Sequence, residues 1–283
     1  MANETYTDIS KEDLRRAQKI MLYIMKKIHT VCVKHNIRYW LDYGTLLGAI
    51  RHGGFIPWDD DLDICMMRED FEKFNKVAQS EFGDEFFWQT PETDPALCYE
   101  YGKVRLNGTL WQETVWMRTA KLKNNGLFID VFPIDPFPVK RIQQVPIALL
   151  CDKVFNRIID YKIFQKSSPN FIKRTVQKIL AVFIPVSMVY RWRKKIVLSL
   201  QKHKNNSSYV SKVTMDTMRD ICDKSLFDEL ILHKFEDTEF YIPACYDMRL
   251  KMLFNNYMQL PPEDKRYGHH GILKYDFGKY SNL

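Results

Sequence analysis

The strongest constraint in this sequence is a run of acids, Asp59-Asp60-Asp61-Leu62-Asp63, that leads directly into the apolar residues Ile64–Met67. The apolar residues indicate that the run belongs to a buried strand. Side chains alternate along a strand, so Asp59, Asp61 and Asp63 are expected on one side. Clustered carboxylates repel unless cations neutralise them, and these oxygen ligands suit Mg²⁺ or Mn²⁺ together with substrate phosphates. A solvated acidic loop and a calcium site are the alternatives.

A Gly44-Thr45 pair stands upstream, where the strand-forming segment Ile37–Tyr43 gives way to the helix-like sequence LLGAIRH. Glycine permits close approach to the backbone, and a helix N-terminus presents free N–H groups that bind phosphate. If this pair and the aspartates lie on adjacent strands, both converge on one phosphorylated ligand. Taken alone, the pair is more typical of an ordinary turn and helix cap.

The order of the expected elements predicts an α/β or α+β domain. An amphipathic helix is expected from Ser10 to about Asn36, and helices alternating with strands up to residue 132 indicate a sheet flanked by helices. The other expected elements are a helix over 69–81, strands at 61–67, 97–106, 109–116, 127–132 and 238–242, and a helix over 244–257.

Composition and charge narrow the class of protein. With 46% apolar residues there is material for a packed core, and the six cysteines form no CxxC pair that would indicate a zinc ribbon or disulfide framework. The polar start of the chain argues against a signal peptide, so we expect a cytoplasmic protein. The charge of +7 is regional, because residues 140–205 contain fifteen Lys and Arg and two acids. Such a distribution favours one docking surface, and no nucleic acid partner is expected.

Residues 140–205 are expected to form a mainly helical basic insertion, with helices over 141–165 and 171–203. Within it, the run Ile179–Tyr190 is almost wholly apolar but spans twelve residues, and Pro185 interrupts it. A helix that crosses a bilayer needs about 20 apolar residues, so this run is too short. Basic residues on both sides match a segment lying among anionic headgroups. The alternative is a buried helix with a solvated basic face.

The stretch from Tyr39 to Asp63 resembles the LicD family of phosphocholine transferases, and most of the chain shares the likeness. The family is similar to the fukutin-related sugar-alcohol-phosphate transferases and, more remotely, to DNA-polymerase-β-type nucleotidyltransferases. Residues 140–205 match nothing in it. At Asn256 family members often carry an acid, so no acidic role is transferred there. The further matching segments are YGKVR at 101–105 with Thr109, GLFIDVFPIDPFP at 126–138, FYIPACYD at 240–247 and NYMQLPPEDKRYGHH at 256–270.

The resemblance implies a nucleotidyltransferase-like mixed sheet, with residues 1–139 as the catalytic core and residues 206–283 completing it around the insertion. It also implies a third carboxylate on a strand near the aspartates. Asp130 is the expected residue, because an acid within the apolar run LFIDVF needs a strong reason to be there. Asp130 is then a metal ligand or a base, and the alternative is an internally paired structural acid. Asp135 is more typical of a loop-stabilising acid.

Basic residues in the matching segments are expected at the donor phosphates. Lys103 and Arg105 lie two apart and share a face of a strand, from which they could clamp a phosphate group. Arg51 and His52 are expected to touch the same ligand. The alternative for all four is an ordinary solvated side chain. For the pair His269-His270, phosphate or metal binding and a structural role both stay open.

The implied reaction is attack by an acceptor hydroxyl on the β-phosphorus of a CDP-alcohol such as CDP-choline, which releases CMP. Asp61 and Asp63 are the expected metal ligands, Asp130 completes the catalytic set, and Asp59 is an accessory ligand. The expected acceptor is a cell-surface glycan, such as lipopolysaccharide or teichoic acid, or its lipid-linked precursor, which places the enzyme peripherally at the inner face of the membrane. A true nucleotidyltransferase that releases pyrophosphate and a non-catalytic binding module are the alternatives.

Overall fold

The computed structural model describes residues 9–97, 99–113, 122–163, 167–202, 204–213, 217–268 and 271–283. The pair His269-His270 and the end of the strand expected at 109–116 lie outside these residues.

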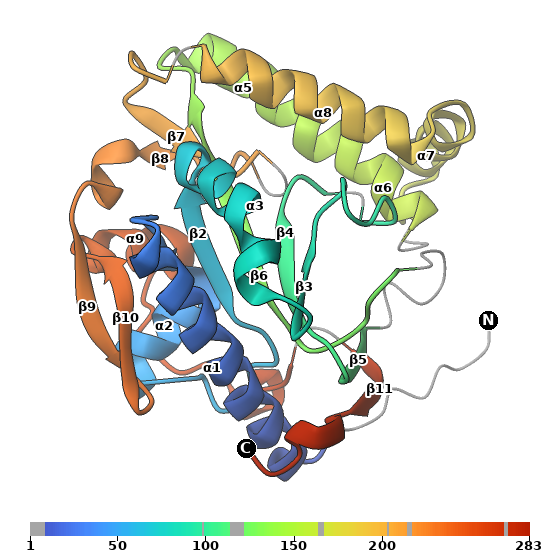
Figure 1. The fold of residues 1–283 in the computed structure, drawn as a ribbon. Helices are drawn as coiled ribbons and strands as arrows, with labels where there is room; N and C mark the ends of the chain where they lie inside the picture. The colour runs from blue at the N-terminus through green and yellow to red at the C-terminus, as the bar shows by residue number, and fades with distance from the viewer. Residues whose placement is uncertain are drawn as a thin grey trace.

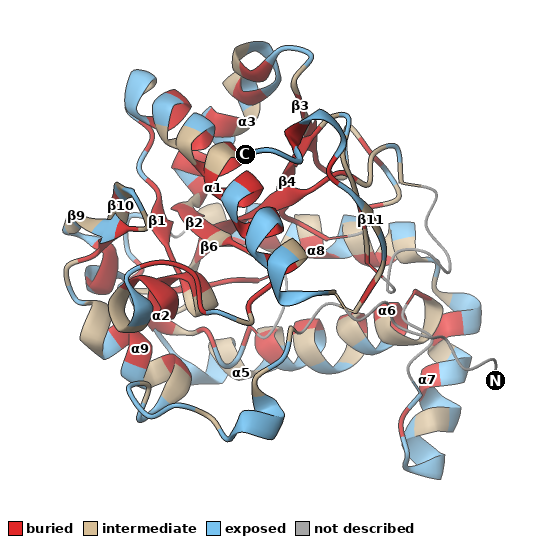
Figure 2. Cartoon of the chain, turned by 90° about the horizontal axis from the view of Figure 1, so that it is seen from below, coloured by how far each residue is buried: buried red, intermediate tan, exposed pale blue. Residues whose placement is uncertain are grey.

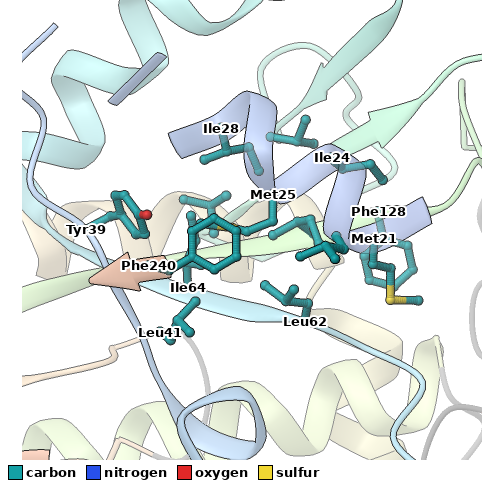
Figure 3. Packing of buried hydrophobic residues seen from close by; sticks show 14 of the residues in the cluster. Met21, Ile24, Met25, Ile28, Tyr39, Leu41, Leu62, Ile64, Phe128 and Phe240 are labelled. Atoms are coloured by element: carbon teal, nitrogen blue, oxygen red, sulfur yellow. The ribbon is translucent and has the colours of Figure 1, made fainter. Parts of the chain in front are cut away.

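The first helix, α1 (Lys11–Lys34), confirms the expected amphipathic helix. It begins after Ser10, whose side chain accepts a hydrogen bond from the backbone N–H of Asp13. Apolar residues at three- and four-residue spacing form one stripe along α1, and this stripe lies on the central sheet (Figure 3). The labelled contacts come from Met21, Ile24, Met25 and Ile28 of α1 and from Ile64, Phe128 and Phe240 beneath them.

The described residues form a seven-stranded mixed sheet, which confirms the expected α/β class (Figure 1). Five strands follow the order β1-β2-β6-β4-β3, β7 pairs with the end of β6, and β8 pairs with β7. The strands are β1 (Trp40–Leu41), β2 (Asp63–Met67), β3 (Phe86–Gln89), β4 (Gly102–Leu106), β6 (Phe128–Phe137), β7 (Tyr209–Ser211) and β8 (Cys222–Asp223).

Strand β6 is the centre of the sheet and positions the third carboxylate. It runs parallel to β2, with Asp63 opposite Asp130, and antiparallel to β4, with Lys103 opposite Asp130. Further along β6, Asp135 is fully buried, and both its carboxylate oxygens accept hydrogen bonds from Arg68 at 2.8 and 2.9 Å. The loop role expected for Asp135 was therefore wrong, because this acid lies in a strand and forms a buried ion pair.

The sheet separates two hydrophobic clusters, as the alternation of β2 shows. Ile64 and Met66 pack in the cluster that contains α1 and α3 (Arg68–Phe82). Cys65, between them, packs in the second cluster, which joins β6 to the helices of the insertion. Asp63 therefore stands at the start of a strand that is buried on both faces.

The insertion is helical, as expected, and leaves β6 near Phe137 and returns to pair with it at β7 (Figure 1). The single helix expected over 171–203 is broken at Ile184-Pro185, because proline has no N–H to continue it. The elements of the insertion are α5 (Arg141–Leu149), a π-helical turn (Leu150–Phe155), α6 (Asn156–Lys162), α7 (Phe171–Phe183) and α8 (Val186–Gln201).

The C-terminal part packs around this core. A hairpin of β9 and β10 leads into α9, and β11 pairs with β5, from which it is separated by more than half of the chain. None of the helices in the described part of the chain combines the length and apolar character that a membrane span requires. The helices and strands whose bounds have not yet been given are α2 (Tyr43–His52), β5 (Leu110–Glu113), β9 (Leu230–Phe235), β10 (Thr238–Pro243), α9 (Tyr246–Phe254) and β11 (Ile272–Asp276).

Candidate active site

Three of the four clustered aspartates open into one cavity of about 520 Å³. Asp59, Asp61 and Asp63 line it and Asp60 does not, as alternation along an extended chain predicts. The expectation that all of them lie on a strand was wrong in part, since β2 begins only at Asp63 and the earlier acids lie in the segment that precedes it. The cavity lies within the size range of small-molecule sites.

The acids that precede β2 are close enough to share a cation. In the described part of the chain, Asp59, Asp60 and Asp61 each offer an oxygen, and these oxygens lie within 4.8 Å of one another. Burial, together with the neighbouring charges of Asp61, Asp63 and Asp60, raises the pKa of Asp59 well above its ordinary value. A divalent cation would offset this repulsion, so the residues fit Mg²⁺ or Mn²⁺.

Helix α2 brings its first turn to the same cavity. The Gly44-Thr45 pair was expected in a turn before the helix, but α2 already begins at Tyr43. Gly44 lines the cavity, and a Cβ built on it would lie 3.0 Å from a carboxylate oxygen of Asp59. A Cβ at this position would push the Asp59 carboxylate aside by a few tenths of an ångström, so glycine permits the observed close approach. The buried Thr45 hydroxyl accepts a hydrogen bond of 2.8 Å from the backbone N–H of Asp63, which fixes the start of β2 to α2.

Asp130 lies beside Asp63 on the neighbouring strand and forms an ion pair with Lys103. Lys103 Nζ lies 2.9 Å from one oxygen of Asp130 and 3.1 Å from the other, and it lies 3.8 Å from Glu113. All three side chains are buried, and neither Asp130 nor Lys103 is among the residues that line the cavity. Lys103 thus neutralises Asp130 in the structure, and its expected place at the donor phosphates stays a prediction.

The other expected phosphate ligands are Arg105, Arg51 and His52, and of these three Arg51 lines the cavity. Arg105 is fully buried away from the cavity, donates to Gln89 at 2.5 Å and to the Gly126 carbonyl at 2.8 Å, and stacks on Phe128. These contacts give no support to a phosphate role for Arg105, which stays an untested prediction.

Arg51, in contrast, lines the cavity and donates to the Tyr257 carbonyl at 2.8 Å. Burial, and then the neighbouring charge of Arg266, lowers its pKa. His52 is adjacent to Arg51 but is not among the lining residues, and its ring meets the Trp58 ring edge to face. Burial and the Arg51 charge lower the pKa of His52, which favours the neutral imidazole.

The cavity is also lined by three basic residues that sequence reasoning missed, and we call them the basic wall: Lys212, Arg219 and Lys265. Lys212 is buried, with its Nζ 4.0 Å from the centre of the Tyr43 ring and 4.3 Å from that of Phe132. Lys265 belongs to a segment already singled out by its resemblance, which could have suggested it. Lys212 and Arg219 stand in no recognised motif and are brought to the site by the pairing of β7 with β6.

A buried ion-pair network fixes the two walls to each other. Arg249 of α9 donates to both carboxylate oxygens of Asp42 at 3.0 and 2.8 Å and to Asp220 at 2.7 Å. Asp42 caps the N-terminus of α2, and Asp220 accepts from the backbone N–H of Lys212 at 2.9 Å. The Arg249 guanidinium therefore connects Asp42, at the start of α2, with Asp220, which binds the backbone of Lys212 in the basic wall.

Comparisons with known proteins show which sequences this chain resembles. Residues 36–145 match the family described as LicD/FKTN/FKRP, nucleotidyltransferase domain. The chain is 28% identical to the lipopolysaccharide cholinephosphotransferase LicD of Haemophilus influenzae over 93% of its own length and 97% of that protein. It is 32% identical to the ribitol 5-phosphate transferase FKRP of Mus musculus, over 35% of this chain and 17% of that protein. An uncharacterised protein of Rickettsia typhi is 46% identical over 26% of this chain and 25% of that protein. The resemblance to LicD proteins and their fukutin-related relatives is thus confirmed.

Proposed function

We propose that this chain is a metal-dependent transferase that moves an alcohol phosphate from a CDP-alcohol to a hydroxyl group, because residues 36–145 match the LicD/FKTN/FKRP nucleotidyltransferase domain. The observation that carries the proposal is that acidic and basic side chains line one cavity. Asp59, Asp61 and Asp63 line it together with Lys212 and Arg219. A diphosphate bridged to the carboxylates by cations would meet basic side chains on its open side.

Each residue has a distinct role in this proposal. Asp61 and Asp63 hold Mg²⁺ or Mn²⁺, with Asp59 as an accessory ligand. When bound, the metal neutralises charge that develops on the attacking and leaving oxygens. Asp130 lies next to Asp63 and completes the acidic set, while Lys103 compensates its charge. Lys212 and Arg219 orient the donor phosphates so that the β-phosphorus faces the acceptor hydroxyl.

Choline is the donor alcohol that we propose, and it rests on the likeness to the Haemophilus influenzae cholinephosphotransferase. Tyr43, Trp58 and Tyr257 line the cavity, and a trimethylammonium group prefers aromatic surroundings. The proposed acceptor is a glycan or its lipid-linked precursor, and the enzyme is then expected at the inner face of the membrane.

The test is product analysis with a panel of CDP-alcohols that carry choline, ribitol, glycerol or ethanolamine. We expect CMP to accumulate in the presence of Mg²⁺ and an acceptor, and chelation to stop it. Asp61→Asn and Asp63→Asn should each abolish CMP release, while the melting temperature of the metal-free protein stays equal or rises because carboxylate repulsion falls. Pyrophosphate release from CTP would instead identify a true nucleotidyltransferase. Turnover near the wild-type level in either variant at saturating Mg²⁺ would refute the metal assignment.

A further inference from the structure

Helix α7 exposes an apolar stripe to solvent at the edge of the molecule (Figure 2). The residues of this α7 stripe follow one another at spacings of four, three and four, so they lie on one side of the helix. These residues are 49–78% exposed, whereas α1, the longest helix in the described part of the chain, buries its apolar side. The α7 stripe consists of Ile172, Val176, Ile179 and Phe183.

The opposite side of α7 is held in place by a buried polar residue. Gln177 accepts a hydrogen bond from the Ser168 backbone N–H at 3.0 Å and donates one to the Arg157 carbonyl at 3.0 Å. Ala181, one turn further on, is also buried. Rotation of α7 to bury its apolar side would break both hydrogen bonds and leave buried polar groups unpaired. The inverted orientation, with glutamine inside and isoleucine outside, is therefore fixed by specific contacts.

Basic residues border the stripe, and no acid lies among residues 171–183. Lys173 and Lys178 are exposed on either side of it. The basic residues that follow Pro185 contribute less than their sequence suggests. Arg193 is 1% exposed and donates to Asn156 at 2.8 Å, and Lys194 pairs with Glu92 at 2.6 Å.

We infer that the α7 stripe docks the protein on an anionic membrane surface, with α7 lying in the headgroup region parallel to the bilayer. At 13 residues α7 is too short to span it. An apolar side with lysines at its borders is the pattern of helices that lie in such an interface, because the apolar side enters the acyl boundary while the lysines reach lipid phosphates. This surface lies outside the cavity and goes beyond the proposed transfer reaction.

The experiment is co-sedimentation of the full chain with vesicles of equal parts phosphatidylcholine and phosphatidylglycerol. The wild-type protein is expected to sediment at low ionic strength and to be released by salt. Ile179→Asp/Phe183→Asp should weaken binding by about tenfold or more, because it removes apolar burial and adds negative charge. The matched control is Val33→Asp/Leu232→Asp, which places the same charges at other exposed apolar positions, 57% and 49% exposed, and should bind like wild type.

All four substituted positions are exposed, so we expect both double variants to fold, and circular dichroism melting checks this. No sedimentation of the wild type at low ionic strength, or equal binding by the α7 variant and its control, would overturn the inference. It is also wrong if sedimentation velocity shows a wild-type dimer that the α7 variant dissociates, because the partner is then a second copy. Binding is measured without donor or acceptor, so its failure and a failure of CMP release are separate results.

Discussion

Replacement of Arg249 by methionine tests whether the two walls of the cavity are held together as the structure indicates. The guanidinium is 0% exposed and pairs with Asp42, 0% exposed, and Asp220, 4% exposed. Methionine fills similar space without charge, so the variant leaves two buried carboxylates without their cation. Breaking a single buried pair in this way costs about 3–5 kcal/mol of folding free energy. Because one side chain serves two acids here, we expect Arg249→Met to lose at least that amount.

The same helix supplies a matched control. Lys251 pairs with Asp247 at 2.7 Å, but these side chains are 64% and 49% exposed. Exposed pairs of this kind contribute up to about 1 kcal/mol, so Lys251→Met should be nearly neutral.

Guanidinium chloride unfolding followed by tryptophan fluorescence compares the two variants. Adding Asp220→Asn to Arg249→Met removes one stranded charge and should restore part of the lost stability. A loss from Arg249→Met no larger than that from Lys251→Met would refute the reasoning.

Two further outcomes are expected. Gly44→Ala should keep the wild-type melting temperature but require more Mg²⁺ for CMP release, because its Cβ would lie 3.0 Å from Asp59 Oδ2, and an unchanged Mg²⁺ titration would contradict this. Burial raises the pKa of Glu100 to about 7, above its ordinary value of 4.5. The contribution of Glu100 to the free energy of unfolding is therefore largest below its ordinary pKa of 4.5, where the carboxyl is protonated. This contribution is lost as pH rises through the folded-state pKa of about 7. Glu100→Gln should then gain up to about 3 kcal/mol relative to wild type between about pH 5 and pH 8, as measured by denaturant unfolding across pH.

The elements with strong periodicity were predictable from sequence alone. α1, α3 and the run into β2 follow from apolar spacing, and their observed bounds differ from the expected ones by one or two residues at most ends. The strands β3, β7, β8, β9 and β11 were missed, because each has six residues or fewer and its burial pattern comes from tertiary packing.

The candidate site was predictable on its acidic side and at Gly44 and Arg51, which line the same cavity. Alternation correctly placed Asp59, Asp61 and Asp63 toward one cavity, and the apolar run around Asp130 indicated a buried acid. Whether a basic residue reaches the cavity is decided by long-range contacts that spacing does not reveal. Arg105 and Lys212 illustrate this, since the motif residue is buried against Gln89 and the unremarkable lysine lines the cavity.

The placement of the two cavity walls along the chain also sets the order in which the site is synthesised. Every expected metal ligand has left the ribosome by Asp130, whereas the basic wall begins only at Lys212. β7, which brings that wall to the sheet, pairs with β6 across about seventy intervening residues. A nascent chain that stops before Lys212 therefore carries every expected metal ligand but neither the basic wall nor Arg249, whose guanidinium holds Asp42 at the start of α2.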